Sequence, residues 1–421
     1  MSVNSNNSTF LHCTNARPER IGFPSVRLLA VSGAIQGRQA QMTLRHPMYT
    51  EETEVIRDQI RRFIDREIEP NGERWEEEGT FPRDLYVKAG EAGILGLGFP
   101  EEYGGAGGGI DYYCLVREEM AASGFGGIRV SLMAHGIGLP PVLNLGSDDL
   151  KRRVAPQVLS GNKIICLAIS EPNGGSDVAN IRTTARREGD HYVVNGEKAF
   201  ISNGVRADYM SVAVRTGGEG MGGISLLLIE GDAPGISRTN MRKSGWWTSD
   251  TGHIIFDDVR VPVSNLLGQE NAGFRGIMNN FNLERLGIAA TQIGVSRCAY
   301  REAVRYAHER QTFGKHLAEF QVVRHKLVDM AVRLQAMESQ MDSLIWRVMQ
   351  GDPCIAGIAM LKVYCGEAHE WIAAEAAQIF GGASLLRGHK VERIFRESKI
   401  LTIGGGSTEV MKDLASRQLG W

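Results

Sequence analysis

The stretch from Leu167 to Val178 reads LAISEPNGGSDV, and the fold of the chain is best worked out from it. The apolar run from Ile164 to Ile169 predicts a buried strand that leads into a loop. The paired glycines that end at Gly175 allow the loop backbone to approach a ligand closely. Ser170 and Ser176 flank this loop as neutral hydrogen-bond donors. Such a cluster is also typical of an ordinary turn, so the neighbouring sequence must decide between a turn and a binding loop.

A second stretch, Asn195 to Asp208, reads NGEKAFISNGVRAD. Together the two stretches resemble the flavin-binding signatures of the acyl-CoA dehydrogenase family, and the resemblance extends from about Tyr49 to the C-terminus. In that family the first loop wraps the flavin ring and the second supplies an aromatic and a hydroxyl residue against it. By this resemblance the residues around the ring would be Leu167, Ser170, Gly175, Ser176, Phe200 and Ser202. The family more often has Trp where this chain has Phe200.

Length and composition limit the classes of function. A chain of 421 residues suggests about three domain-sized pieces. The net charge of -2, with 23% charged residues, gives no basic field for nucleic acid or an anionic membrane. The cysteines form no CxxC pair and are expected to be reduced, and no metal site is predicted. No uncharged apolar run approaches the roughly 20 residues of a membrane span.

Residues 1–47 differ in composition from the rest of the chain. They are rich in Ser and Asn at the start and contain several arginines, but Glu19 is their only acid. This composition is typical either of a disordered extension ahead of a start near Met42, which we favour, or of a mitochondrial transit peptide. The first interpretation favours a cytoplasmic protein and the second a protein of the mitochondrial matrix.

The remaining sequence predicts a mainly α protein with a central β domain. Helical spacing of apolar residues, with Thr50 as a first N-cap, predicts an N-terminal α domain at 48–162. Strand-like periodicity predicts a small β-barrel or sandwich domain at 163–275, with a hairpin turn at Asn195-Gly196. Long apolar stripes predict a C-terminal four-helix bundle at 276–421, in which 391–400 forms a single helix.

The family's reaction needs a carboxylate base, and in most members a motif like YEGT before the last helix supplies it. This chain reads IGGGST there, so the glutamate position is Gly405. The isovaleryl-CoA and long-chain branches place the glutamate on the first bundle helix, before an arginine. That position is Glu284, followed by Arg285, on one helical stripe with Ile277, Phe281 and Ile288. An ordinary helix-edge ion pair is the alternative interpretation, and the missing glutamate at 405 favours the base.

The resemblance also implies the other contacts of substrate and cofactor. The Gly405 backbone N–H would hold the thioester oxygen, and Ser176, Asn282, Arg285 and Gly406 would contact the substrate. Arg310, in the family-like segment RQTFG, would pair with the pyrophosphate of FAD. The remaining FAD contacts, several of them with the adenine half and from a neighbouring subunit, would be Phe313, Gln321, Gln378, Gly381, Gly382, Ser407 and Glu409. A shared cofactor predicts a homotetramer, or at least a dimer.

The leading hypothesis is an FAD-dependent acyl-CoA dehydrogenase that introduces an α,β double bond and passes electrons to electron-transfer flavoprotein. The base position resembles the branched- and long-chain branches, and small residues at 121–127 would leave room at the end of the acyl pocket. A flavin-dependent oxidase or monooxygenase on the same fold is the second hypothesis. A helical binding protein without chemistry is the third.

Overall fold

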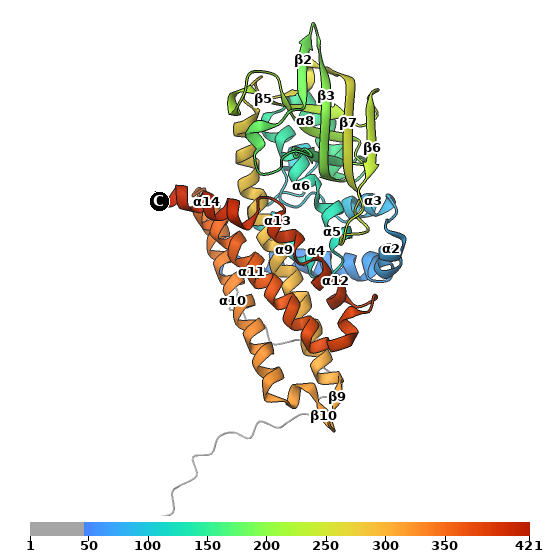
Figure 1. The fold of residues 1–421 in the computed structure, drawn as a ribbon, viewed down its shortest axis with the longest axis vertical. Helices are drawn as coiled ribbons and strands as arrows, with labels where there is room; N and C mark the ends of the chain where they lie inside the picture. Colours follow the sequence, from blue (N-terminus) through green and yellow to red (C-terminus); the bar gives the residue numbers. More distant parts are fainter. Residues whose placement is uncertain (1–45) are drawn as a thin grey trace, which may run out of the picture. The chain divides into compact units, whose positions relative to one another are not determined.

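The structure, a computed structural model, describes residues 46–421. The predicted extension or transit peptide therefore lies almost wholly outside the described residues. The first part of the described chain is helical (Figure 1). Its α-helices are α1 (Glu51–Phe63), α2 (Gly72–Glu78), α3 (Asp84–Glu91), α4 (Ile110–Ala121), α5 (Gly126–Met133), α6 (His135–Gly138), α7 (Pro140–Leu145) and α8 (Asp148–Leu159). Thr50 caps α1 as predicted, in a reciprocal capping box with Thr53.

The central part forms one mixed sheet. Its strands are β1 (Ile165–Ala168), β2 (Thr184–Glu188), β3 (His191–Ser202), β4 (Tyr209–Arg215), β5 (Ile224–Glu230), β6 (Ile236–Asn240), β7 (Thr251–Pro262) and β8 (Leu266–Leu267). The strand order is β6-β7-β3-β2-β4-β5-β8, and β1 pairs in parallel with β4. The pairings β3–β7, β4–β5, β5–β8 and β6–β7 are antiparallel, and β2 pairs antiparallel with β3.

The predicted hairpin turn at Asn195-Gly196 is wrong. β3 runs without a break through both residues, and the hairpin with β2 turns instead at Gly189 and Asp190, where Gly189 has a φ of 63°. Gly196, at a φ of 137°, lies at a register shift between β3 and β7. An added Cβ there would lie 2.6 Å from the Thr183 Cα. The glycine therefore serves a bulge with close backbone packing, which the Asn-Gly pair alone does not distinguish from a turn.

The C-terminal part is a set of long helices. They are α9 (Gly273–Glu309), α10 (Gln321–Met349), α11 (Ile355–Phe380), α12 (Lys390–Glu397), α13 (Ile400–Ile403) and α14 (Thr408–Leu419), and the short strands β9 (Gln311–Thr312) and β10 (Lys315–His316) join α9 to α10. The prediction of one helix over 391–400 is wrong, because the helix stops at Glu397. The Ser398 hydroxyl donates to the Phe395 carbonyl, and Ser398 and Lys399 form a turn before α13.

The apolar cores connect the central sheet to the start of α9. One core cluster combines Leu167 and Val178, at the two ends of the quoted loop, with Ile277 and Phe281 of α9. This packing places the loop against the helix that carries Glu284. Among residues 46–421, no helix is long and apolar enough to cross a membrane. The domain boundaries at 162 and 275 stay predictions.

Candidate active site

A buried ion pair holds the loop at 167–178 in place. The Lys198 ammonium donates to the Glu171 carboxylate at 2.8 Å and to the Ile169 carbonyl at 2.9 Å. Glu171 also accepts from the backbone N–H groups of Arg182 and Thr183. Burial lowers the pKa of Lys198 to about 8 against the opposing effect of Glu171. Both charges in the pair have hydrogen-bonded partners. The contacts of Glu171 therefore fix the loop to β3 through Lys198 and to the backbone at Arg182 and Thr183.

The same loop lies beside the predicted flavin-stacking residue. The Ala199 N–H donates to the Ser170 carbonyl at 2.9 Å, which places Phe200 next to the start of the loop. Phe200 has a φ of 62° and a side chain that is 64% exposed. A bulky residue in this backbone region is strained, and such strain is found where a site requires it. Ser176 is exposed, and Ser170 and Ser202 are partly buried.

The loop leaves open space in front of its backbone. An added Cβ at Gly174 would meet nothing within 4 Å, and one at Gly175 would meet only the Ser170 hydroxyl, at 3.6 Å. An exposed aromatic ring, neutral donors and uncovered backbone together fit a flat, polar-edged ring such as a flavin. The residues present therefore fit the cofactor that the sequence predicts.

Glu284 is a half-buried residue whose carboxylate is incompletely paired. Its Oε2 atom is buried and has no hydrogen-bond partner. Burial raises the pKa of Glu284 to about 7, against the opposing positive charges of Arg285, Arg117 and Lys362. A carboxyl group with that pKa can accept a proton at neutral pH, as a general base requires.

Gly405 faces the same point as Glu284. A Cβ added at Gly405 would lie 3.7 Å from the Glu284 Oε1 and 2.2 Å from the Ile288 Cδ1. The φ of Gly405 is 66°, which also favours glycine. A side chain at position 405 and the Glu284 side chain would therefore converge on one space, although the two positions are far apart in the sequence.

The structure gives the predicted substrate residues different environments. The Asn282 amide donates to the Pro353 carbonyl at 2.8 Å, so it is turned toward the connection between α10 and α11. Arg285 is buried, and its guanidinium lies 5.7 Å from the centre of the Phe281 ring. The described structure contains no ion pair between Glu284 and Arg285, so the alternative of an ordinary helix-edge pair has no support.

The residues predicted to bind the rest of FAD form two groups. Ser407 and Glu409 lie at the start of α14, where the Ser407 hydroxyl accepts from the Val410 N–H. The other group lies at the opposite end of the bundle, near β9 and β10 (Figure 1). Its members are Arg310, Phe313, Gln321, Gln378, Gly381 and Gly382, and the Tyr306 and Phe380 rings stack there at 4.1 Å. Phe313 is 92% exposed.

A long stretch of helix lies between Glu284 and the distal group. Helix α9 carries Glu284 near its start, and Arg310 follows directly after its end. At about 1.5 Å rise per residue, roughly 39 Å of helix separates them. Glu284 and the distal group therefore lie at well-separated points along one helix.

Sequence reasoning missed two buried cations beside Glu284. Arg117 of α4 lies against Gly287, where an added Cβ would be 2.8 Å from the Arg117 Cδ. Lys362 of α11 donates to the Gly406 carbonyl at 2.6 Å. Neither residue belongs to a local motif, and their proximity to Glu284 follows from tertiary packing, so the sequence carries no signal for them.

Comparison with known proteins finds matches over most of the chain. Three family models match: the acyl-CoA dehydrogenase N-terminal domain at residues 50–162, the middle domain at 166–259 and the C-terminal domain at 271–420. An acyl-CoA dehydrogenase of Bacillus subtilis (strain 168) is 35% identical, over 88% of this chain and 98% of its own. The long-chain specific acyl-CoA dehydrogenase, mitochondrial, of Sus scrofa is 32% identical, over 88% and 87%. The crystal structure of acyl-CoA dehydrogenase from Geobacillus kaustophilus is 33% identical, with a TM-score of 0.85, and the match covers 90% of this chain and all of that one.

The fold and site define a flavoprotein oxidoreductase that acts on CH–CH groups. The chain belongs to the acyl-CoA dehydrogenase family.

Proposed function

We propose that this protein is an FAD-dependent acyl-CoA dehydrogenase in which Glu284 is the catalytic base. The observation that carries the proposal is the convergence of Glu284 and Gly405 on one space. A side chain at position 405 would reach toward the Glu284 carboxylate, and the Oε2 of that carboxylate has no protein partner. An unpartnered buried carboxylate oxygen is costly, so a substrate proton donor is a better explanation of it than structural stabilisation.

The chain's own residues account for the proton transfer. Glu284 would remove a proton from the α-carbon of the acyl thioester, and burial of its carboxylate strengthens it as a base. The Gly405 N–H would donate to the thioester oxygen as negative charge develops there, a contribution of about 2.7–4 kcal/mol for one such donor. FAD, when bound, supplies the acceptor for the hydride that leaves the β-carbon. The product is an α,β-unsaturated thioester.

The cofactor contacts suggest a homo-oligomer. Leu167, Ser170, Ser176, Phe200 and Ser202 would hold the flavin ring of one subunit. The distal group, with Arg310 for the pyrophosphate, would meet the cofactor of a neighbouring copy. The separation of these groups along α9 supports a homodimer or homotetramer. Sedimentation of the FAD-loaded protein as a monomer would contradict this part of the proposal.

The position of the base supports a proposal for the substrate class. Glu284 on the first long helix resembles the branched- and long-chain branches, and one of the relatives named above is long-chain specific. We propose a branched or long acyl-CoA as substrate and electron-transfer flavoprotein as acceptor. A panel of straight and branched acyl-CoAs tests the first point, and strict preference for short straight chains would contradict it.

Anaerobic mixing of the FAD-loaded protein with acyl-CoA tests the proposed function directly. A dehydrogenase bleaches its flavin absorbance without oxygen, and electron-transfer flavoprotein then restores the colour. A flavin oxidase or monooxygenase would instead require oxygen or NADH and would give no anaerobic response to the thioester. A protein that takes up no FAD would contradict both enzyme classes.

A further inference from the structure

We propose that Lys362 is a positioning residue for the proposed dehydrogenation: its ammonium group holds the glycine loop at 404–406 and supplies a positive charge beside Glu284. The proposal rests on the proposed function, because it assigns Lys362 a role toward the same base and the same backbone donor. Neither the sequence motifs nor the predicted site residues include this lysine.

The position of Lys362 is unusual for a lysine. It lies about two turns into α11, and it is only 2% exposed. Lysine is seldom buried in this way without a partner of opposite charge. The described structure gives it no ion pair with a carboxylate, and its one hydrogen bond goes to the Gly406 carbonyl at 2.6 Å. A buried ammonium with a single backbone acceptor is costly, so the contact to this loop needs an explanation.

The loop that Lys362 holds has little stiffness of its own. Gly404, Gly405 and Gly406 follow one another, with φ angles of -64°, 66° and 100°. Three consecutive glycines lose more conformational freedom on ordering than any other tripeptide. In residues 46–421, no other side chain donates to the backbone of these three residues. The anchor on Gly406 therefore limits the directions in which the neighbouring Gly405 N–H can point.

The charge of Lys362 acts on the base as well. The charged and titratable groups that face Glu284 are Arg285 on its own helix, Arg117 and Tyr113 on α4, and Lys362 on α11. Burial lowers the pKa of Lys362 to about 8, with a further decrease from Arg285 and an opposing effect of Glu284. At neutral pH the lysine is thus still largely protonated, and its charge favours the ionised carboxylate of Glu284.

Lys362→Met, studied in the FAD-loaded protein, separates this role from a merely structural one. We expect kcat/KM for acyl-CoA at pH 7 to fall about 10- to 100-fold, because the oxyanion donor and the base both lose their support. Removing a positive charge raises the pKa of Glu284, so the rising limb of the pH profile should move to higher pH by about 0.5–1 unit. Amide hydrogen exchange of the 401–408 peptide should become faster.

Two further variants divide the role into its parts. Lys362→Gln keeps a hydrogen-bond donor but removes the charge. The rising limb of the pH profile should therefore move to higher pH, while amide hydrogen exchange of the 401–408 peptide stays slow. Gly404→Ala, added to Lys362→Met, stiffens the loop at a φ that alanine adopts, and its Cβ would lie 3.4 Å from the Ile400 carbonyl oxygen. This addition should recover several-fold of the lost kcat/KM and slow the exchange, without moving the pH limb back.

Lys412→Met is the matched control. Lys412 lies on α14 just beyond the same loop and pairs with Glu367 on the surface. It should leave kcat/KM, the pH limb and loop exchange unchanged. If wild type bleaches with acyl-CoA and Lys362→Met keeps the wild-type pH limb and loop exchange, the role of Lys362 is disproved while the proposed function stands. If wild type does not bleach, the proposed function fails instead.

Discussion

The proposed chemistry of Glu284 depends on the absence of a close ionic partner for its carboxylate. Burial raises the pKa to about 7, and three cations, Arg285, Arg117 and Lys362, limit the rise. A carboxylate with a closer ionic partner would titrate lower and would be a weaker base. The absence of an ion pair with the adjacent Arg285 is therefore as important to the function as the burial itself.

The pH dependence of kcat/KM follows from this pKa. The base is active when it is deprotonated, so kcat/KM should rise about tenfold per pH unit below pH 7 and level off above it. The rise of kcat/KM with pH can be measured from steady-state rates at a series of pH values, with one acyl-CoA and an artificial electron acceptor. A limb near pH 4.5, the ordinary range of a glutamate, would contradict the desolvated base.

At the residue scale the sequence predicts Glu284 as the base but does not predict the cations that lie around it. Glu284 stands out because it shares a stripe with Ile288 and because Gly405 replaces the usual glutamate. Arg117 and Lys362 come from other helices, and their sequence neighbours give no indication of their partners. A residue whose role depends on a contact with another helix cannot be recognised from local spacing.

At the scale of elements, the loop at 167–178 is held in position by a lysine of β3. Lys198 precedes Ala199 and Phe200 on β3 and reaches back to Glu171 in the loop. The pair is almost fully buried, with exposed side-chain fractions of 0% and 2%. Loss of one partner leaves the other as an uncompensated buried charge.

A pair of variants tests this coupling. Lys198→Met alone should lower the free energy of unfolding by about 3–5 kcal/mol and weaken FAD retention, since the flavin loop loses its anchor. Lys198→Met combined with Glu171→Gln should recover most of the stability, because no unpaired charge remains. Urea unfolding and the FAD content after gel filtration measure both effects. Equal stability of the single and double variants would contradict the coupling.

The types of the elements are easier to predict from the sequence than the turns and breaks between them. Periodicity gave the helical, β and helical succession and the N-cap at Thr50, because these depend on neighbours along the chain. The Asn195-Gly196 pair predicts a turn that is not there. Gly196 instead lies at a bulge in the pairing of β3 with β7 and packs closely against Thr183. The break between α12 and α13 was also missed, since Ser398 and Lys399 carry no strong helix-stop signal.

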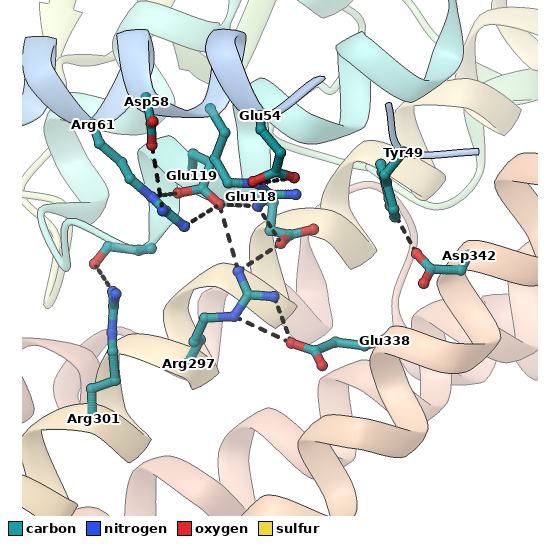
Figure 2. A network of polar contacts seen from close by, with 12 residues as sticks. Tyr49, Glu54, Asp58, Arg61, Glu118, Glu119, Arg297, Arg301, Glu338 and Asp342 are labelled. Atoms are coloured by element: carbon teal, nitrogen blue, oxygen red, sulfur yellow. Dashed lines mark hydrogen bonds and ion pairs between the residues drawn. The ribbon is translucent and has the colours of Figure 1, made fainter. Parts of the chain in front are cut away.

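At the scale of the whole molecule, a buried ionic network joins the N-terminal helices to the bundle (Figure 2). Arg57 and Arg61 of α1 contact Glu119 of α4. Arg297 of α9 bonds to Glu118 at 2.6 Å and to Glu338 of α10 at 2.5 Å. Nearby, the Tyr49 hydroxyl donates to Asp342 at 2.8 Å. Four helices are therefore tied together, and apart from the half-exposed Arg61 these charges have little access to water.

Glu119 should make stability depend on pH. Burial alone would raise its pKa, but Arg57, Arg61 and Arg297 outweigh burial and lower the pKa to about 2. The folded state then binds the proton less tightly than the unfolded chain does, where the pKa is about 4.3. This contribution, about 3 kcal/mol at most, is present in full above the unfolded value and is lost as the pH falls toward 2.

Glu119→Gln should accordingly lower the free energy of unfolding by about 3 kcal/mol or more at pH 7, because it also leaves the arginines without a buried partner. The difference from wild type should shrink between pH 5 and pH 3.5. Urea unfolding at these pH values measures it, and Glu102→Gln, at an exposed position, is the control. A difference that does not vary with pH would contradict the assignment. Sequence reasoning gave no sign of this network, since its members lie on four separate helices.

The most direct test of the central claim is the anaerobic flavin response of Glu284→Gln. The substitution keeps the shape of the side chain and removes its basicity, so the protein should bind FAD and acyl-CoA. We predict that acyl-CoA bleaches wild type and leaves the variant yellow, with a rate at least about 10³-fold lower. Bleaching of the variant at the wild-type rate would contradict the account, because the proton would then be leaving to a different group.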